Sequence, residues 1–205
     1  MSTMKEPYRL EGKKTMGLEL AEQLGWQLPD VILYPTGGGT GLIGMWKAFQ
    51  ELTDLGWLKS DARPRMFSCQ SSGCAPIVDA FDTGADKGAD VDNPHTIASG
   101  LRVPKAFADF MILDAVRESG GRAMAAPEDR LMEWTRLAMS REGIALCPES
   151  ATCIGVLEAS LQAGHIKPDE KIVLFNTGAT QKYVEFMETS LPSIDKANVD
   201  WNSLV

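Results

Sequence analysis

The sequence predicts an α/β protein, a three-layer sandwich with a mostly parallel sheet. Short apolar runs rich in branched residues, typical of strands buried on both faces, alternate with longer segments whose apolar residues recur at helical spacing. Glycines stand where several of the helical segments end. Because strands separated by helices of this length pair in parallel through right-handed crossovers, we expect helices on both faces of one sheet.

The first half of the chain supplies two strands, each followed by a helix. The strand candidates are short apolar runs, whereas the helix candidates carry an apolar stripe among charged residues. A Gly- and Asp-rich stretch then predicts a surface loop. In order, the expected elements are a helix at 15–24, a strand at 31–34, a helix at 42–55, a strand at 65–69, a helix at 75–81 and the loop at 83–93.

The second half continues the alternation. Pro127 is expected at the first position of a helix, where a missing amide hydrogen costs nothing. The last strand is followed directly by Asn176, Thr177 and Gly178. In order, the expected elements are a helix at 107–119, a strand at 121–126, a helix at 127–141, a strand at 143–147, a helix at 150–163 and a strand at 171–175.

Composition excludes several classes of function. The 205 residues, 44% of them hydrophobic, suffice for one sizeable core. A net charge of -8 without a dense Lys/Arg stripe argues against nucleic acid as a partner. No apolar run is long enough for a signal peptide or a membrane span, so we expect a cytoplasmic protein with no membrane partner. Four cysteines without CxxC spacing and only two histidines predict no metal site.

The most informative segment is the glycine run Gly37-Gly38-Gly39-Thr40-Gly41, which joins the first strand to the second helix. Ligands of parallel α/β sheets bind at the carboxyl ends of strands. Glycine permits positive φ and has no Cβ to keep an anion away from the amide nitrogens. Several amides can therefore hold one phosphate at the positive end of the helix, with the Thr40 hydroxyl as a further donor.

The glycine run also permits other interpretations. Gly39, Gly41 and Gly44 have the spacing of a dinucleotide-binding turn, but the next strand ends at 68–70 without an acidic residue to hold a ribose. A Walker phosphate loop requires a Lys-Ser/Thr pair after the glycines, and none follows. A tight turn without a ligand stays open, although a single glycine normally suffices for one.

Four segments resemble a known family. Residues 35–44, Pro-Thr-Gly-Gly-Gly-Thr-Gly-Leu-Ile-Gly, resemble the phosphate loop of the fold type II (tryptophan synthase β-like) pyridoxal-phosphate enzymes, and their first five residues resemble the threonine synthase branch. Residues 175–178, Phe-Asn-Thr-Gly, are similar to the strand end where these enzymes place a hydroxyl against the pyridine nitrogen. Residues 96–103 and 147–151 resemble pocket-lining segments. The matches follow the family's order and cover nearly the whole chain.

The resemblance implies pyridoxal phosphate as the cofactor, and it implies a role for each matching residue. The glycine run would hold the phosphate, and a neutral hydroxyl would face the ring nitrogen. Such a hydroxyl leaves the nitrogen unprotonated, which suits elimination and replacement chemistry. The residues implied to bind the cofactor are Gly37, Gly38, Gly39, Thr40, Gly41 and Thr177, and those implied to line the pocket are Ser99, Gly100, Arg102 and Glu149.

Ordinary structural roles remain open for three of these residues. Thr177 is also suited to cap a helix that follows the last strand. Glu149 is also explained as a solvated carboxylate in the first turn of a helix. Arg102 either pairs with a phosphate or carboxylate of the substrate or is a surface arginine.

The family's Schiff-base lysine, which lies in a Ser-x-Lys-Asp-type segment upstream of the glycine loop, has no counterpart here. Lys13, Lys14 and Lys47 stand in the charged surroundings typical of surface lysines. We therefore expect no catalytic residue in this chain, and whether it retains pyridoxal phosphate is left open. The resemblance implies a carboxy-terminal portion, with 1–35 entering from the small domain, 36–190 in the large domain and 191–205 as a polar tail.

The implied activity is that of threonine synthase, a lyase that converts O-phospho-L-homoserine and water into L-threonine and phosphate. The expected substrate is thus a small phosphorylated amino acid. We expect the isolated chain to be inactive, and unpaired strand edges favour a homo-oligomer. Two alternatives stay open: a threonine or serine dehydratase of the same fold, and a noncatalytic protein that binds a phosphate ligand or a partner subunit.

Overall fold

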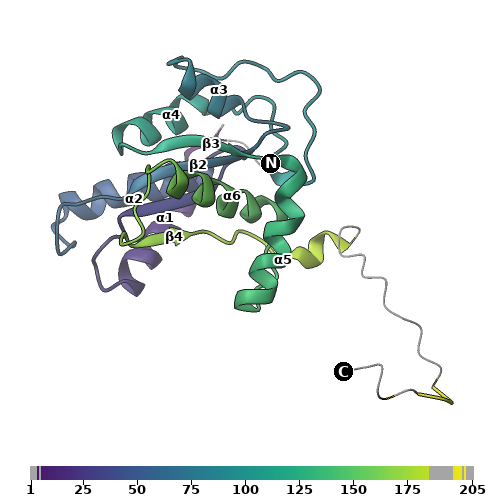
Figure 1. Ribbon diagram of the computed structural model, residues 1–205. Coiled ribbons are helices and arrows are strands. Elements are labelled where there is room, and N and C mark those ends of the chain that lie inside the picture. The colour runs from purple at the N-terminus through teal and green to yellow at the C-terminus, as the bar shows by residue number, and fades with distance from the viewer. Residues whose placement is uncertain (1–3, 5, 185–195, 200, 202–205) are drawn as a thin grey trace.

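The computed structural model, which describes Met4 and residues 6–184, 196–199 and 201, has a layered α/β fold (Figure 1). Within this part of the chain, four strands form one parallel sheet in the order β3-β2-β1-β4. The α/β sandwich predicted from the sequence is confirmed. The strands are β1 (Val31–Pro35), β2 (Arg65–Ser71), β3 (Arg122–Ala126) and β4 (Ile172–Leu174).

Helices cover both faces of this sheet. Figure 1 shows α6 lying across one face, with α5 beside it. On the other face α2 and α4 contact the strands, and α1 packs against the outer side of α2. The helices are α1 (Pro7–Gln23), α2 (Thr40–Asp54), α3 (Pro76–Asp82), α4 (Asp109–Glu118), α5 (Leu131–Glu142) and α6 (Pro148–Gln162).

The central strand β1 is buried along its whole length, which explains its unbroken apolar sequence. Ile32 belongs to the core between the sheet and α2, whereas Val31 and Leu33 belong to the core under α6. Burial of each such side chain contributes about 1.5–3 kcal/mol to stability. The two cores hold the carboxyl ends of β1 and β4 side by side, because Leu33 pairs with Leu174 in the ladder.

The first helix begins earlier than the sequence pattern indicates. Residues 15–24 were expected, but α1 starts at Pro7, which occupies its first turn. Charged residues dominate the first two turns and hide the apolar periodicity. Tertiary contacts hold these turns instead: Glu11 pairs with Lys47 of α2, and Lys13 packs against Gly44 of α2, where an added Cβ would lie 2.8 Å from the Lys13 side chain.

The strand predicted at 143–147 is wrong. Gly143 ends α5 in the left-handed region and Cys147 is already the residue before α6, so too few residues remain for a strand. Only an isolated bridge joins Leu146 to Ala179. Pro127 likewise precedes the short helix η2 (Glu128–Arg130), after which α5 begins, rather than opening α5 itself.

The other predicted elements are confirmed within a few residues. They are β1, α2, β2, α3, α4, β3, α6 and β4, and no helix or strand interrupts the loop at 83–93. The predicted division of the chain into domain portions at residues 35 and 190 stays a prediction. The strand β1 lies inside the sheet, between β2 and β4. Most of the predicted tail at 191–205 lies outside the described residues. No helix in the described ranges is long and apolar enough to cross a membrane.

Candidate active site

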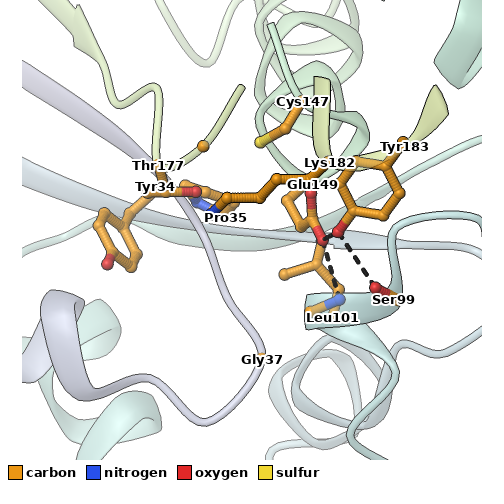
Figure 2. Close-up of a pocket in the computed structure, with 12 residues that line it drawn as sticks. Tyr34, Pro35, Gly37, Ser99, Leu101, Cys147, Glu149, Thr177, Lys182 and Tyr183 are labelled. Atoms are coloured by element: carbon orange, nitrogen blue, oxygen red, sulfur yellow. Dashed lines mark hydrogen bonds between the residues drawn. The ribbon is translucent and has the colours of Figure 1, made fainter. Parts of the chain in front are cut away.

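A cavity of about 310 Å³ opens at the carboxyl ends of β1 and β4 (Figure 2). Five segments that are distant in the sequence meet there: the end of β1, the short helix η1 (Ser99–Leu101), the start of α6, the residues after β4, and the short helix η3 (Thr180–Lys182) with Tyr183. Of the residues predicted to form the site, those that line this cavity are Gly37, Ser99, Gly100, Glu149 and Thr177.

The glycine loop approaches its neighbours too closely for side chains at three positions, Gly37, Gly39 and Gly41. Gly39, the residue before α2, has φ +74°, and a Cβ there would lie 2.3 Å from the Ile112 side chain. A Cβ at Gly37 would lie 2.4 Å from the carbonyl oxygen of Gly100. The loop is therefore pressed against η1, and its shape requires glycine.

The amides of the glycine loop are unbonded within the described part of the chain. The neighbours on either side are paired: Thr36 N donates to Cys69 O at 2.8 Å, and Ile43 N donates to Gly39 O at 3.0 Å. Between them, the amides of residues 37–41 have no acceptor among the described residues. Unpaired amides at the N-terminus of a 15-residue helix meet the physical requirement for holding an anion.

A second cavity of about 400 Å³ borders the other side of the loop. Gly38 and Thr40 line it together with two cations, Arg9 and Lys105, and Gly100 lines both cavities. The loop therefore separates two hollows. Its amides can be reached from solvent, and Gly38 itself is exposed.

Glu149 ties three segments together at the wall of the first cavity. Its side chain, on a residue only 8% exposed, accepts a hydrogen bond from Gly100 N at 2.8 Å and another from the Tyr183 hydroxyl. That hydroxyl also lies 3.1 Å from Ser99 Oγ. Glu149 is thus buried and bonded rather than solvated, and it fixes η1 against the segment that carries Tyr183.

Two tyrosines of the cavity have raised pKa values. Burial raises the pKa of Tyr34 to about 12, with a smaller contribution from Cys153. Burial also raises the pKa of Tyr183 to about 12, and the Glu149 carboxylate adds to this effect. Both side chains are therefore neutral hydrogen-bonding groups at physiological pH.

Thr177 follows β4 and lines the cavity, where its residue is exposed. Its amide donates to Ser150 Oγ at 3.0 Å, which ties the end of β4 to α6. Its hydroxyl makes no hydrogen bond to the described residues. The alternative role as a helix cap does not apply, because Ala179 precedes η3. The side chain is available to a ligand in the cavity.

Three of the predicted residues, Gly39, Gly41 and Arg102, line neither of these two cavities. Arg102 is exposed and is not among the residues that line the first cavity. No group of three metal-binding side chains occurs in the part of the chain that the structure describes. The roles assigned to individual residues by the resemblance stay predictions.

Sequence patterns did not reveal every residue of the cavity. Tyr34, Lys182 and Tyr183 line it as well, and Cys147 lines it from the segment at 147–151 that the resemblance assigned to the pocket. Burial raises the pKa of the Cys147 thiol, which lies 3.2 Å from Ser150 Oγ, so the thiol stays protonated. Tyr34 belongs to a strand whose apolar run suggested only core, and Lys182 and Tyr183 lie in an irregular segment without periodicity.

Comparisons with known proteins agree with this geometry. Residues 1–178 match the family described as pyridoxal-phosphate dependent enzymes. The chain is 38% identical, over 84% of its length, to the threonine synthase of Methanocaldococcus jannaschii and 34% identical, over 95% of its length, to that of Methanosarcina acetivorans. It spans 42% and 48% of these two relatives.

A solved structure shows the same fold. Threonine deaminase isoform 2 from Solanum lycopersicum superposes with a TM-score of 0.67 at 18% identity, over 90% of this chain and 51% of that one. The cofactor of the matched family is pyridoxal phosphate, as the sequence predicted. The chain belongs to the family of pyridoxal-phosphate dependent enzymes.

Proposed function

We propose that this chain is the cofactor-binding, carboxy-terminal portion of an enzyme of the threonine synthase type. The observation that carries the proposal is the meeting of four sequence-matched segments around one cavity, next to a glycine loop whose amides lack protein acceptors. Curated relatives named threonine synthase, at 34–38% identity, support this branch of the family.

Each segment has a separate task in this proposal. The amides of residues 37–41 bind the phosphate of pyridoxal phosphate, and the Thr40 hydroxyl assists them. Thr177 presents a neutral hydroxyl to the ring nitrogen. When bound, pyridoxal phosphate supplies an electron-withdrawing ring that stabilises negative charge on a substrate carbon. Glu149 positions Gly100, and through it the wall next to Gly37.

The intact enzyme converts O-phospho-L-homoserine and water into L-threonine and phosphate. This chain supplies only part of that machinery, since it contains no Ser-x-Lys-Asp segment and spans about half the length of its curated relatives. We therefore propose that the isolated chain binds the phosphorylated cofactor and turns over no substrate.

Binding and turnover are tested separately. Calorimetric titration of the full chain is expected to give tighter binding for pyridoxal phosphate than for pyridoxal, because only the former carries the phosphate. In the presence of pyridoxal phosphate, the chain is expected to release no phosphate from O-phospho-L-homoserine. The amides of residues 37–41, which are proposed to bind the phosphate, are called the phosphate cradle. Equal affinity for pyridoxal phosphate and pyridoxal would contradict phosphate binding by this cradle. Measurable threonine formation would contradict the proposed inactivity of the isolated chain.

A further inference from the structure

Lys182 supplies the one cationic side chain among the residues that line the first cavity. It is the last residue of η3, and Figure 2 shows its side chain extending across the cavity toward Pro35 at the end of β1. A Cβ added at Gly178 would lie 3.6 Å from its Nζ. The ammonium group therefore lies within the ring of segments that form the site, at the solvent-exposed side of the cavity.

Lys182 has no ion-pair partner among the described residues. The carboxylate in the same cavity, that of Glu149, already accepts hydrogen bonds from Gly100 N and from the Tyr183 hydroxyl. Three other lysines of the described residues do form ion pairs, namely Lys14, Lys47 and Lys105, and none of these three lines the cavity. The positive charge of Lys182 thus faces the cavity without an ion-pair partner in the part of the chain that the structure describes.

The electrostatics of the cavity call for such a charge when a phosphate enters. The glycine loop itself offers amide dipoles and the helix N-terminus, and the cations Arg9 and Lys105 line the second cavity and not the first. Glu149 lies in the same wall and repels a dianion. The net charge of -8 adds to this repulsion at long range. A cation that lines the same cavity as Gly37 offsets both effects.

We propose that Lys182 completes the phosphate site: its ammonium group binds the phosphate of the ligand whose other oxygens are held by the glycine loop. This inference rests on the proposed function and deepens it, because it assigns the cavity to dianionic phosphate esters over their neutral counterparts. Lys182 is a ligand-binding residue in this assignment, and it takes no part in a covalent bond.

The contribution of Lys182 to phosphate affinity should be measurable but small. Lys182 is exposed at the mouth of the cavity, so solvent screens its charge. Removal of the charge is expected to weaken phosphate binding by about fivefold, between the effect of an exposed ion pair and that of a charge-assisted hydrogen bond. The effect is expected to shrink as the salt concentration rises.

The test uses ligands that cannot form an imine with any lysine. The full chain and its variants are titrated calorimetrically with pyridoxine 5′-phosphate and with pyridoxine, which differ only in the phosphate and lack an aldehyde. Lys182→Met is expected to lose about fivefold in affinity for the phosphate ester and nothing for pyridoxine, and Lys182→Arg is expected to recover most of the loss. Lys171→Met removes a charge beyond the other end of β4 and serves as the matched control.

The outcomes separate this inference from the proposed function. If the wild-type chain prefers the phosphate ester and Lys182→Met binds it equally well, the role of Lys182 is overturned and the cradle stands. If Lys171→Met weakens binding as much as Lys182→Met, the loss reflects the net charge of the chain, and the specific contact of Lys182 is overturned. If the wild-type chain does not prefer the phosphate ester, the proposed function fails together with this inference. Circular dichroism spectra of the variants establish that each is folded.

Discussion

The hydroxyl of Tyr183 donates a hydrogen bond to the carboxylate of Glu149 across the wall of the cavity, joining residues 34 positions apart. Through the same carboxylate, Gly100 is held at 2.8 Å. Gly100 in turn abuts Gly37, where a Cβ would lie 2.4 Å from its carbonyl oxygen. Glu149 therefore links the segment that carries Tyr183, through Gly100, to the glycine loop.

Removal of either partner should destabilise the fold, and the two losses should overlap. We expect Tyr183→Phe to lower the free energy of unfolding by about 1 kcal/mol and Glu149→Gln by about 2 kcal/mol, since the latter also weakens the bond to Gly100. The double variant should lose less than the sum, because the two residues share a bond. Urea unfolding of the four proteins measures this coupling, and strict additivity would show that the residues act independently.

A negative charge in the glycine loop should abolish phosphate binding without unfolding the chain. Gly38 is exposed, has no atom within 4 Å of an added Cβ and lies outside the positive-φ region. Gly38→Asp is thus expected to fold and to weaken pyridoxal phosphate binding by more than about tenfold. Its carboxylate would occupy the space next to the loop amides and repel the phosphate.

Gly12→Asp is the matched control for this variant. Gly12 is equally exposed and unhindered, but it lies on α1. The control should bind pyridoxal phosphate like the wild-type chain. Equal binding by both variants would place the ligand away from the loop.

The shape of the loop should depend on Gly39 and not on Gly38. Gly39→Ala puts a Cβ into the positive-φ region and against Ile112, so we expect a loss of about 1–3 kcal/mol in unfolding free energy. Gly38→Ala, which meets open space, should stay within about 0.5 kcal/mol of the wild type. Thermal melts compare the two; equal melting temperatures would contradict the strained geometry.

Stability should fall steeply at alkaline pH because of Tyr34. Its pKa is about 12 in the folded chain, whereas an exposed tyrosine titrates near 10. Between these values the unfolded chain releases the proton and the folded chain retains it, so unfolding becomes easier by about 1.4 kcal/mol per pH unit. Tyr34→Phe should show a shallower decline in denaturant midpoint from pH 10 to 12, and an unchanged decline would contradict the burial of this hydroxyl.

The edges of the sheet should favour self-association. Within the described residues, β3 and β4 each pair on one side only, and the residues of β4 are half-buried. Sedimentation velocity of the isolated chain is expected to give a species larger than a monomer that grows with concentration. A compact monomer at all concentrations would contradict this expectation.

The sequence predicted the fold well where burial sets the pattern. β1, buried on both faces, and α2, with its apolar stripe, were both evident from residue types. The first two turns of α1 were not predicted because tertiary contacts to α2 hold them, such as the ion pair of Glu11 with Lys47, and periodicity does not report such contacts. The apolar run at 143–147 suggested a strand, yet it serves as a connection between two helices.

The site was predicted where glycine carries the signal. The glycine run and the Thr177–Gly178 pair stand directly after strands, so their convergence follows from parallel topology. Tyr183 and Lys182 were missed because their placement depends on the path of an irregular segment. The bond that fixes this path, from Tyr183 to Glu149, is a tertiary contact without a local pattern.

The most direct test of the central claim is an amide NMR titration of the labelled chain with pyridoxine 5′-phosphate, with pyridoxine as the reference ligand. We expect the largest phosphate-specific shifts at Gly37, Gly38, Gly39, Thr40 and Gly41, whose amides lack protein acceptors within the described residues. Unchanged resonances for these five amides at saturating ligand, or equal shifts with both ligands, would contradict the phosphate cradle.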